Sequence, residues 1–293
     1  MKTPNLAQSI DVQRRFGGVI RLYGEAGLQR FMQARVCVIG IGGVGSWAVE
    51  ALARSGIGHL TLVDLDHVAE SNINRQLHAT DATLGQAKIS AMAERIRSYN
   101  PLCAVTEIDD FAEPDNLDAI LGQGFDFVID AIDGVRAKVA ITVWCKAHGV
   151  PLIVAGAAGG QSDPTRIRVS DLSKTEQDPL LAKMRKRLRK EHRFPRDPRR
   201  KFLIEAVYSD EPLLFPEAAA CDIEEGQAVE HSADPVHSGS ASAAAGPTGL
   251  NCAGFGSSIC VTASFGMTLA ARVLHGLSAS ALPAVTPPRS AGE

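Results

Sequence analysis

The sequence predicts an α/β, Rossmann-like fold in which helices flank a mostly parallel sheet. Two observations predict it. Up to about Asp171, short apolar segments alternate with stretches of helical character, which is typical of parallel strands joined by helical crossovers. The first apolar segment also runs directly into a glycine-rich turn, a common link between strand and helix in such sheets. The predicted strands are residues 36–42, 59–66, 104–110, 125–133 and 151–159.

The composition fits one globular unit. The chain has 293 residues, of which 45% are hydrophobic and 22% charged, enough to bury a large core. We expect a single domain over residues 1–293, with the Rossmann core at about 35–171. The N-terminus lacks the apolar run of a secretory signal, and the six cysteines show no framework spacing, so a reducing cytoplasm is the expected compartment.

The chain changes character after residue 171, where we expect a C-terminal extension that contains a mobile loop. Residues 228–249 and 277–293 are predicted to be disordered, because they offer little apolar surface to offset the entropy of ordering. Residues 250–271 carry no charge and are as long as a membrane span. Their many Gly, Ser and Thr residues favour a buried strand or helix instead, so membrane association is not expected.

The glycine-rich turn is the first candidate binding site. Gly40, Gly42 and Gly45 match G-x-G-x-x-G: the first permits a tight turn, the second lets a phosphate approach the backbone, and the third lets the next helix pack on the sheet. A helix from Ser46 would point its N-terminal amides at the anion. Asp64 closes the second strand, where a carboxylate accepts hydrogen bonds from a ribose. These features suit a nicotinamide dinucleotide as well as ATP.

The polar residues that follow favour a triphosphate. Asn74, Arg75 and Gln76 place an amide, a guanidinium and a second amide beside Asp64, and Lys88 follows at the predicted start of a helix. Arginine makes forked contacts with phosphate oxygens, and lysine supplies a mobile point charge. Arg75 or Lys88 taken singly would more often be a solvated surface charge. Together and in this order, the residues indicate a site for ATP.

The fourth predicted strand supplies the candidate metal ligand. It ends in Asp130 and Asp133, at the carboxyl edge of the sheet where ligands bind. Asp133 is placed to hold Mg²⁺, whereas Asp130 taken alone would more often be a helix cap. The eight histidines form no H-x-x-x-H pair, so no metal site beyond magnesium is expected.

These motifs together resemble those of the ubiquitin-activating-enzyme-like (ThiF-type) adenylyltransferases: GxGGxG with Gly43 as its third glycine, an acid closing the second strand, N-x-N-R-Q, a lysine and D-x-x-D. The resemblance covers about residues 10–180. It implies a homodimer that binds ATP and Mg²⁺, adenylates a carboxylate and releases pyrophosphate. In this chemistry a carboxylate attacks phosphorus against like charge, so catalysis is mainly neutralisation and alignment.

The resemblance also implies a role for each matching residue. Asp64 would hold the ribose, Asn74, Arg75 and Lys88 the phosphates, and Asp133 the magnesium. Arg15 is similar to the arginine that such dimers insert into the neighbouring site. The residues implied to bind nucleotide are Gly40, Gly42, Gly43, Gly45, Asp64, Asn74, Arg75, Gln76 and Lys88, and those implied to act in catalysis are Arg15, Arg75, Lys88 and Asp133.

Longer stretches resemble a narrower subfamily, the bacterial tRNA threonylcarbamoyladenosine dehydratases. They are RRFGGVIRLYGEAGLQRF, GIGGVGSWAVEALARSGIG, NINRQLHAT, AGAAGGQSDPTRIRVSDLSKTEQDPLLAKMRKRLR and NCAGFGSS. This resemblance implies that the threonine carboxylate of the modified nucleoside attacks ATP, and that an internal nucleophile of the same modification then displaces AMP and closes a ring. It implies tRNA as a partner and sulfur-transfer proteins as associates.

Other functions stay open at this point. Activation of a ubiquitin-like sulfur carrier is an alternative, although no two cysteines have the CxxC spacing of the structural zinc common in such enzymes. A NAD oxidoreductase or a non-catalytic nucleotide-binding module would share the glycine turn and release no AMP. Cys221 and Cys252, which flank residues 228–249, are candidate nucleophiles or persulfide carriers, but ring closure needs no enzyme thiol.

The basic segment, residues 183–201, is the one physical feature that points to a polyanion. It carries eleven Lys or Arg against one Glu and one Asp, in a chain with a net charge of −3. Such asymmetry focuses positive potential on one surface. Aromatic residues are sparse there, so base stacking is not indicated. We expect tRNA rather than DNA, with Arg185, Lys186, Arg189 and Lys190 only partly facing the RNA.

Overall fold

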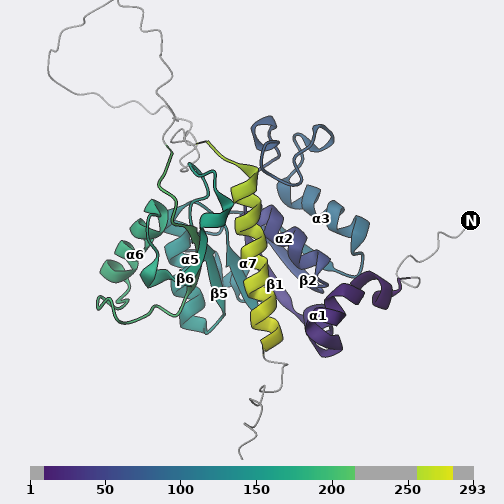
Figure 1. The fold of residues 1–293 in the computed structure, drawn as a ribbon, viewed down its shortest axis with the longest axis horizontal. Coiled ribbons are helices and arrows are strands. Elements are labelled where there is room, and N and C mark those ends of the chain that lie inside the picture. The colour runs from purple at the N-terminus through teal and green to yellow at the C-terminus, as the bar shows by residue number, and fades with distance from the viewer. Residues whose placement is uncertain (1–9, 215–255, 280–293) are drawn as a thin grey trace, which may run out of the picture.

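The computed structural model describes residues 10–214 and 256–279. At the centre of these residues lies a seven-stranded sheet with the order β3-β2-β1-β4-β5-β7-β6 (Figure 1). Neighbouring strands are parallel except β6 and β7, which are antiparallel. The strands are β1 (Arg35–Ile39), β2 (His59–Val63), β3 (Ala104–Ile108), β4 (Phe127–Asp130), β5 (Leu152–Ala155), β6 (Ile167–Asp171) and β7 (Glu205–Ser209). The predicted mostly parallel α/β fold and its five strands are confirmed.

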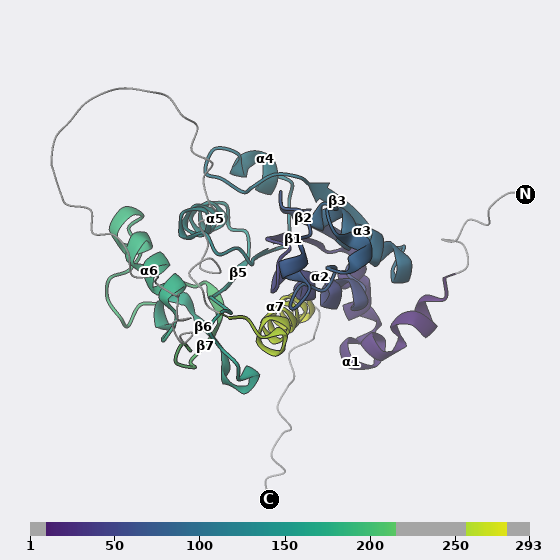
Figure 2. The same ribbon diagram turned by 90° about the horizontal axis from the view of Figure 1, so that it is seen from above.

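Helices cover both faces of the sheet, as Figure 2 shows from above. One face carries α1 (Val12–Gln33), α2 (Gly45–Arg54), α3 (Lys88–Tyr99) and α7 (Ile259–Ala279). The other carries α4 (Leu117–Leu121), α5 (Val135–His148) and α6 (Pro179–Glu191). Single-turn 3-10 helices lie in the connections: η2 (Glu70–Asn72), η3 (Asp81–Thr83), η4 (Pro164–Arg166) and η5 (Leu172–Lys174).

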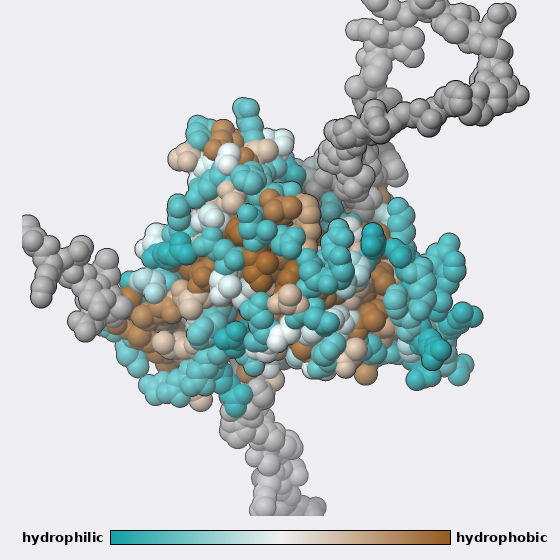
Figure 3. All heavy atoms as spheres, turned by 180° about the vertical axis from the view of Figure 1, so that it is seen from behind, coloured by the Kyte–Doolittle hydropathy of each residue, from teal (hydrophilic) through white to brown (hydrophobic). Residues whose placement is uncertain are grey.

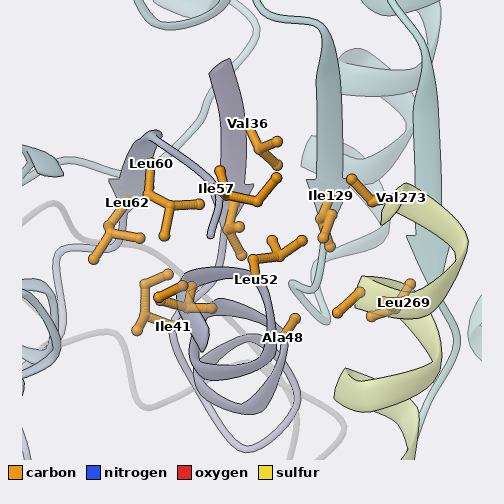
Figure 4. Packing of buried hydrophobic residues seen from close by; sticks show 14 of the residues in the cluster. Val36, Ile41, Ala48, Leu52, Ile57, Leu60, Leu62, Ile129, Leu269 and Val273 are labelled. Atoms are coloured by element: carbon orange, nitrogen blue, oxygen red, sulfur yellow. The ribbon is translucent and has the colours of Figure 1, made fainter. Parts of the chain in front are cut away.

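The alternation of side chains along β1 supplies both cores. Val36 and Val38 pack in the cluster under α2 and α7, whereas Cys37 and Ile39 pack in the cluster under α5. Successive strand residues point to opposite faces, and burying one such side chain stabilises the fold by about 1.5–3 kcal/mol. Figure 4 shows side chains of β1, α2 and α7 meeting in the first cluster. The strand that precedes the glycine turn is therefore fixed from both sides.

Two strands of the sheet were not among the predicted ones. β7 runs parallel to β5 and carries β6 as its antiparallel neighbour at the sheet edge. Arg168 and Val169, next to each other in β6, are both exposed, so β6 lacks the alternation that marks a strand in sequence. β7 follows the basic segment, and it extends the sheet well beyond residue 171.

The uncharged C-terminal segment forms a packed helix. α7 is the one helix in the described part of the chain that is long and apolar enough to span a membrane. It buries Phe265, Leu269 and Val273 against the sheet and α2, and a Cβ on Gly266 would lie 2.4 Å from the Val44 carbonyl oxygen. Of the predicted buried strand or helix, the structure shows a helix from Ile259 onward. Residues 277–279, expected in a disordered tail, instead complete α7; residues 250–255, 228–249 and 280–293 lie outside the described residues.

Candidate active site

The strand order places a ligand crevice between β1 and β4. The chain continues from β1 toward β2 on one side and from β4 toward β5 on the other. Such a switch point, at the carboxyl edge of the strands, is where doubly wound α/β proteins bind ligands. The turns at residues 40–45 and 131–134 meet there, because the Ala131 N–H donates to the Ile39 carbonyl at 2.8 Å.

The glycines of the first turn have separate structural causes. Gly40 has a φ of +87°, and a Cβ there would lie 2.9 Å from Ile132 Cγ2 and 3.0 Å from the Ala131 carbonyl. A Cβ on Gly45 would lie 1.8 Å from the Gly40 carbonyl oxygen, so α2 begins against the strand only with glycine. A Cβ on Gly42 would meet nothing closer than 3.9 Å, so its backbone is open to a ligand. The phosphate-binding role of Gly42 stays a prediction.

Asp64 and Lys88 come together beneath this turn. The buried Asp64 carboxylate accepts hydrogen bonds from the backbone N–H groups of Ile41 (2.6 Å) and Asp66 (2.9 Å). Lys88 Nζ lies 4.0 Å from Asp64 Oδ1 and 2.6 Å from Asp66 Oδ2. Burial raises the pKa of Asp64, and the Lys88 ammonium opposes that rise. Each carboxylate oxygen can accept a further hydrogen bond, so Asp64 can still receive a ribose hydroxyl.

Arg75 extends across the glycine turn. Its Cγ lies 3.2 Å from the position of a Cβ on Gly43. The guanidinium donates to the Ser71 carbonyl (2.8 Å) and to Asn74 Oδ1 (2.9 Å). The Arg75 carbonyl in turn accepts from Trp47 Nε1 on α2 at 3.1 Å. These contacts hold a half-buried guanidinium beside the open backbone of the turn, where forked contacts to phosphate oxygens are possible.

Two buried amides support the same loop. Asn72 Oδ1 accepts from the Ala69 N–H at 3.0 Å, which closes the single turn of η2. Gln76 is buried with its Nε2 3.9 Å from the position of a Cβ on Gly42. The structure therefore places Gln76 next to the glycine turn. It also shows that Asn72, to which the sequence analysis gave no role, shapes the loop.

Asn74 connects the loop to two later parts of the chain. Its Nδ2 donates to the Ser257 carbonyl in a long hydrogen bond of 3.5 Å, and Ser257 pairs with Gly159 in an isolated antiparallel bridge. The Gly160 N–H donates to the Gly256 carbonyl at 2.8 Å. The loop after β5 and the segment before α7 therefore border the site, which no local sequence signal indicated.

Asp130 is not a helix cap, although the sequence favours that role when the residue is taken alone. Its fully buried carboxylate pairs with the fully buried Lys138 of α5, at 2.9 Å between Nζ and Oδ1. Lys138 Nζ also donates to the Ile132 carbonyl at 3.0 Å, while the residue at the cap of α5 is Gly134. Burial raises the pKa of Asp130, and the Lys138 ammonium opposes the rise. The pair ties the turn at 131–134 to α5.

Asp133 lies exposed in that turn. Magnesium is usually held by one or two carboxylates together with substrate phosphates and water. Among residues 10–214 and 256–279, no three His, Cys, Asp or Glu side chains gather around a metal position. One exposed carboxylate at the carboxyl edge of β4 thus fits an ion shared with a nucleotide and does not fit a metal caged by protein alone.

Arg15 lies at the other end of α2 from the glycine turn. It is exposed on α1, and the ring of its neighbour Phe16 lies 3.5 Å from the position of a Cβ on Gly56, just past the end of α2. The ten residues of α2 span about 15 Å. Arg15 therefore does not reach the turn of its own chain, and its action on the site of a second chain stays a prediction. Cys221 and Cys252 lie outside the described residues.

Lys138 is the main residue that the sequence analysis missed. A periodicity signal was present, because Lys138 shares a helix face with the buried residues Ile141, Thr142 and Cys145. A lysine on the apolar face of a predicted helix, shortly after a buried aspartate, indicates an ion pair. Ser257 gave no such signal, since its contact with Asn74 spans 183 residues.

The fold and this site define a nucleotide-binding α/β protein. It has a glycine turn of the kind that binds phosphate, a buried aspartate after β2 and two cationic side chains near the turn. The model of the ThiF family matches residues 16–286, and the chain belongs to the ThiF family.

Similar proteins include tRNA threonylcarbamoyladenosine dehydratases along nearly their whole length. The Haemophilus influenzae protein is 47% identical over 273 residues, covering 93% of this chain and 96% of that protein. The Escherichia coli protein is 46% identical, covering 92% and 95%. A crystal structure of the Escherichia coli enzyme in complex with ATP has a TM-score of 0.77 at 43% identity, covering 92% and 96%. The resemblance noted in the sequence is confirmed.

Proposed function

We propose that this chain catalyses the ATP-dependent cyclisation of threonylcarbamoyladenosine in tRNA. One observation carries the proposal: this chain is 46–47% identical to tRNA threonylcarbamoyladenosine dehydratases over almost the full length of this chain and of each of those proteins. The site geometry agrees with it, because Asp64, Arg75 and Lys88 converge on an open glycine turn. By contrast, the similarity to the Escherichia coli molybdopterin-synthase adenylyltransferase is 35% and covers only 48% of this chain.

The proposed reaction has two steps that balance. The threonine carboxylate attacks the α-phosphorus of ATP, forming an acyl–O–P bond while the bond to pyrophosphate breaks. An internal nucleophile of the modification then attacks the acyl carbon, loses its proton, and AMP leaves with the carboxylate oxygen. The products are the cyclic nucleoside, AMP and pyrophosphate, so ATP removes the elements of water.

The chain's own groups supply alignment and charge in this scheme. Asp64 receives the ribose hydroxyls, and the N-terminal amides of α2 face the phosphates. Arg75 and Lys88 neutralise phosphate oxygens as negative charge shifts onto pyrophosphate. Asp133 would hold Mg²⁺, which supplies further charge neutralisation to the triphosphate when bound. The Asp130–Lys138 pair keeps the turn that carries Asp133 in place.

We also propose a homodimer in which Arg15 acts on the partner's site. Support comes from the position of Arg15, one helix length from its own turn, and from three large apolar side chains that are exposed on two helices, namely Leu22 of α1 and Ile259 and Met267 of α7. Arginines that stabilise phosphoryl charge contribute roughly 10³–10⁵ in rate. Mixing inactive Arg15→Ala with inactive Asp133→Asn protomers should restore activity, because a mixed dimer holds one intact composite site. Proven subunit exchange without activity would refute the arrangement.

The compartment and further partners belong to the same proposal. A cytoplasmic location is supported by the proposed tRNA substrate and by the described cysteines Cys37, Cys103, Cys145 and Cys260, which are free of disulfides. Association with sulfur-transfer proteins is supported by the family resemblance alone. Affinity capture of the tagged chain from its own cells, compared with an Asp133→Asn chain as bait, tests this association, and recovery of no sulfur-transfer protein by either bait would contradict it.

The function itself is tested by AMP release. The protein is incubated with ATP and with tRNA that carries threonylcarbamoyladenosine, with unmodified tRNA, or with a carrier protein ending in Gly-Gly. We expect AMP only with the modified tRNA, and mass spectrometry of its nucleosides should show the loss of one water. AMP release with the carrier alone would assign sulfur-carrier activation, and no AMP with any acid would indicate a non-adenylating nucleotide-binding protein.

A further inference from the structure

We propose that Gln161 is a specificity residue that binds the ureido group of threonylcarbamoyladenosine. This inference rests on the proposed function, because it assigns a contact to that substrate. A ureido group is a carbonyl between two nitrogens, here the N6 of adenine and the amino nitrogen of threonine. Gln161 has a buried carboxamide without a partner among the described residues, and it lies on the side of the site that the nucleotide leaves open.

The Gln161 carboxamide is buried without hydrogen bonds. The residue is 4% exposed, and neither its Oε1 nor its Nε2 has a partner in the part of the chain that the structure describes. The buried Asn100, by comparison, leaves only its Oδ1 unpaired, because its Nδ2 donates to the Ala53 carbonyl at 2.9 Å. Burying an unpaired amide costs free energy, so each such group needs an explanation. The two free ends of Gln161 indicate a bound group that the folded chain alone does not supply.

The backbone around Gln161 is held strongly on one side and weakly on the other. After Gln161, the N–H and the hydroxyl of Ser162 both donate to the Glu211 carboxylate, at 3.0 Å each. This anchor positions the carboxamide before substrate binds, and a preorganised group loses less entropy on binding. Before Gln161, the Gly160 N–H donates to the Gly256 carbonyl at 2.8 Å. Both amide ends are covered, and the glycine contact can open to admit a ligand, since segments held by few backbone hydrogen bonds open at low cost.

The loop that carries Gln161 is connected to the glycine turn. Gly159, two residues before Gln161, pairs with Ser257 in an isolated bridge, and the Ser257 carbonyl accepts from Asn74 Nδ2 at 3.5 Å. Asn74 Oδ1 accepts in turn from Arg75 Nη1 at 2.9 Å. A chain of contacts thus leads from the guanidinium at the glycine turn to the loop after β5.

The nucleotide leaves the β4–β5 side of the crevice open to the substrate. Asp64 follows β2, which lies on the other side of β1 from β4, so a ribose bound to Asp64 extends away from β4. The acid that attacks the α-phosphorus then approaches over the edge formed by β4 and β5. Asp133 follows β4 and Gln161 follows β5, so Gln161 is placed beside the incoming threonine carboxylate.

A ureido group matches the Gln161 carboxamide. The carboxamide offers a carbonyl and an N–H side by side, and a ureido group can present its own carbonyl beside one N–H, so two parallel hydrogen bonds form. A trans peptide bond presents its carbonyl and its N–H on opposite edges. The contact therefore also selects against a carrier protein that ends in Gly-Gly.

The same contact orients the nucleophile of the second step. Only the oxygen of the ureido group, or its nitrogen on adenine, completes a five-membered ring with the acyl carbon. Whichever atom attacks, one ureido N–H loses its proton and AMP leaves with the carboxylate oxygen. Holding the ureido group therefore aligns the internal nucleophile with the acyl carbon.

The test compares Gln161→Met with the matched exposed change Gln123→Met. Methionine keeps the length of the side chain and removes both amide ends. Gln123 is exposed and follows α4, on the face of the molecule opposite α7 (Figure 2), which Figure 3 shows. Filter binding of modified and unmodified tRNA is measured with α,β-methylene-ATP, which cannot release pyrophosphate. We expect Gln161→Met to bind modified tRNA about 5–150-fold more weakly, as the loss of two hydrogen bonds implies. Its affinities for unmodified tRNA and for the nucleotide, and all affinities of Gln123→Met, should be those of wild type.

A second measurement separates a substrate contact from a structural role. Replacing an unpaired buried amide by an apolar group of similar shape is nearly neutral or stabilising, so the Tm of Gln161→Met should equal or exceed that of wild type. A methyl group on the adenine-side ureido nitrogen removes one N–H from the modified tRNA. Wild type should lose affinity on this methylation, whereas Gln161→Met should bind both modified tRNAs equally, because the contact is already absent. Gln161→Asn, which draws the amide back by one methylene, repeats the test if Gln161→Met does not fold.

The outcomes separate this inference from the proposed function. Wild-type affinity of Gln161→Met for modified tRNA would show that water alone pairs with the amide. An equal loss of affinity for unmodified tRNA, or an equal loss on methylation in variant and wild type, would show that Gln161 does not contact the ureido group. Each of these results overturns the inference while AMP release by the wild-type chain stands. A wild-type chain that prefers modified tRNA and yet forms neither AMP nor the cyclic nucleoside would instead refute the proposed function.

Discussion

Replacing Lys138 with methionine should destabilise the protein strongly. The substitution keeps the length of the side chain and removes its ammonium, which leaves the Asp130 carboxylate unpaired at 0% exposure. Removing one partner of a buried ion pair costs about 3–5 kcal/mol of folding free energy. For a chain of this size, 1 kcal/mol corresponds to about 2–4 °C in Tm, so the expected loss is about 6–20 °C.

The destabilisation should depend on pH in one direction. Without Lys138, burial is opposed only by the hydrogen bond from the Ile132 N–H, so the pKa of Asp130 rises further. A carboxyl whose folded pKa lies above its unfolded value of about 3.9 binds its proton more tightly in the folded state. The variant should therefore regain stability, relative to wild type, as the pH falls through the folded pKa toward about 3.9.

The assay is denaturant unfolding of Lys138→Met and two reference chains over a pH series. Arg136→Met, an exposed position on the same helix, should change the free energy of unfolding by less than about 0.5 kcal/mol. The double variant Asp130→Asn with Lys138→Met removes both charges and should recover much of the loss. A single variant that loses under about 1 kcal/mol, or a double variant no more stable than the single one, would refute the reasoning.

Three more predictions concern the turn, the metal ligand and a buried histidine. Gly45→Ala should abolish soluble folded protein or ATP binding, because its Cβ would lie 1.8 Å from a carbonyl oxygen. Gly42→Ala, whose Cβ would meet nothing closer than 3.9 Å, should fold with wild-type Tm and bind ATP less tightly. Equal losses of Tm in the two variants would contradict this. Asp133→Asn should abolish AMP formation while ATP affinity by calorimetry falls only modestly, and wild-type turnover would remove the magnesium assignment. Burial lowers the pKa of His78 to about 4, below the unfolded value of about 6.5, so acidification across this range should cost up to about 3 kcal/mol of stability. His78→Leu should flatten that part of the stability curve, and an unchanged curve would show that His78 does not titrate there.

The sequence by itself determined the local parts of this protein. The strand, the glycine turn and α2 are consecutive. Within this turn Gly40 has a φ of +87°, and Gly45 lies so close to the Gly40 carbonyl that a Cβ would not fit. The place of Asp64 also follows from the sequence, because a residue at the end of the strand next to β1 must lie at the same sheet edge. Long stretches similar to one subfamily then sufficed to indicate the chemistry.

Only the tertiary structure decided the contacts that join distant segments. Asp130 taken alone is predicted to be a helix cap, but α5 packs on the sheet and brings Lys138 to it. β7 enters the sheet between β5 and β6 only because the chain returns after α6, and α7 covers α2 from more than two hundred residues away. Such placements depend on how complementary apolar faces fit together in space, which local propensity does not encode. For the same reason the basic segment was visible as charge in the sequence, while the pocket lined by five of its cations emerged only from the folded chain.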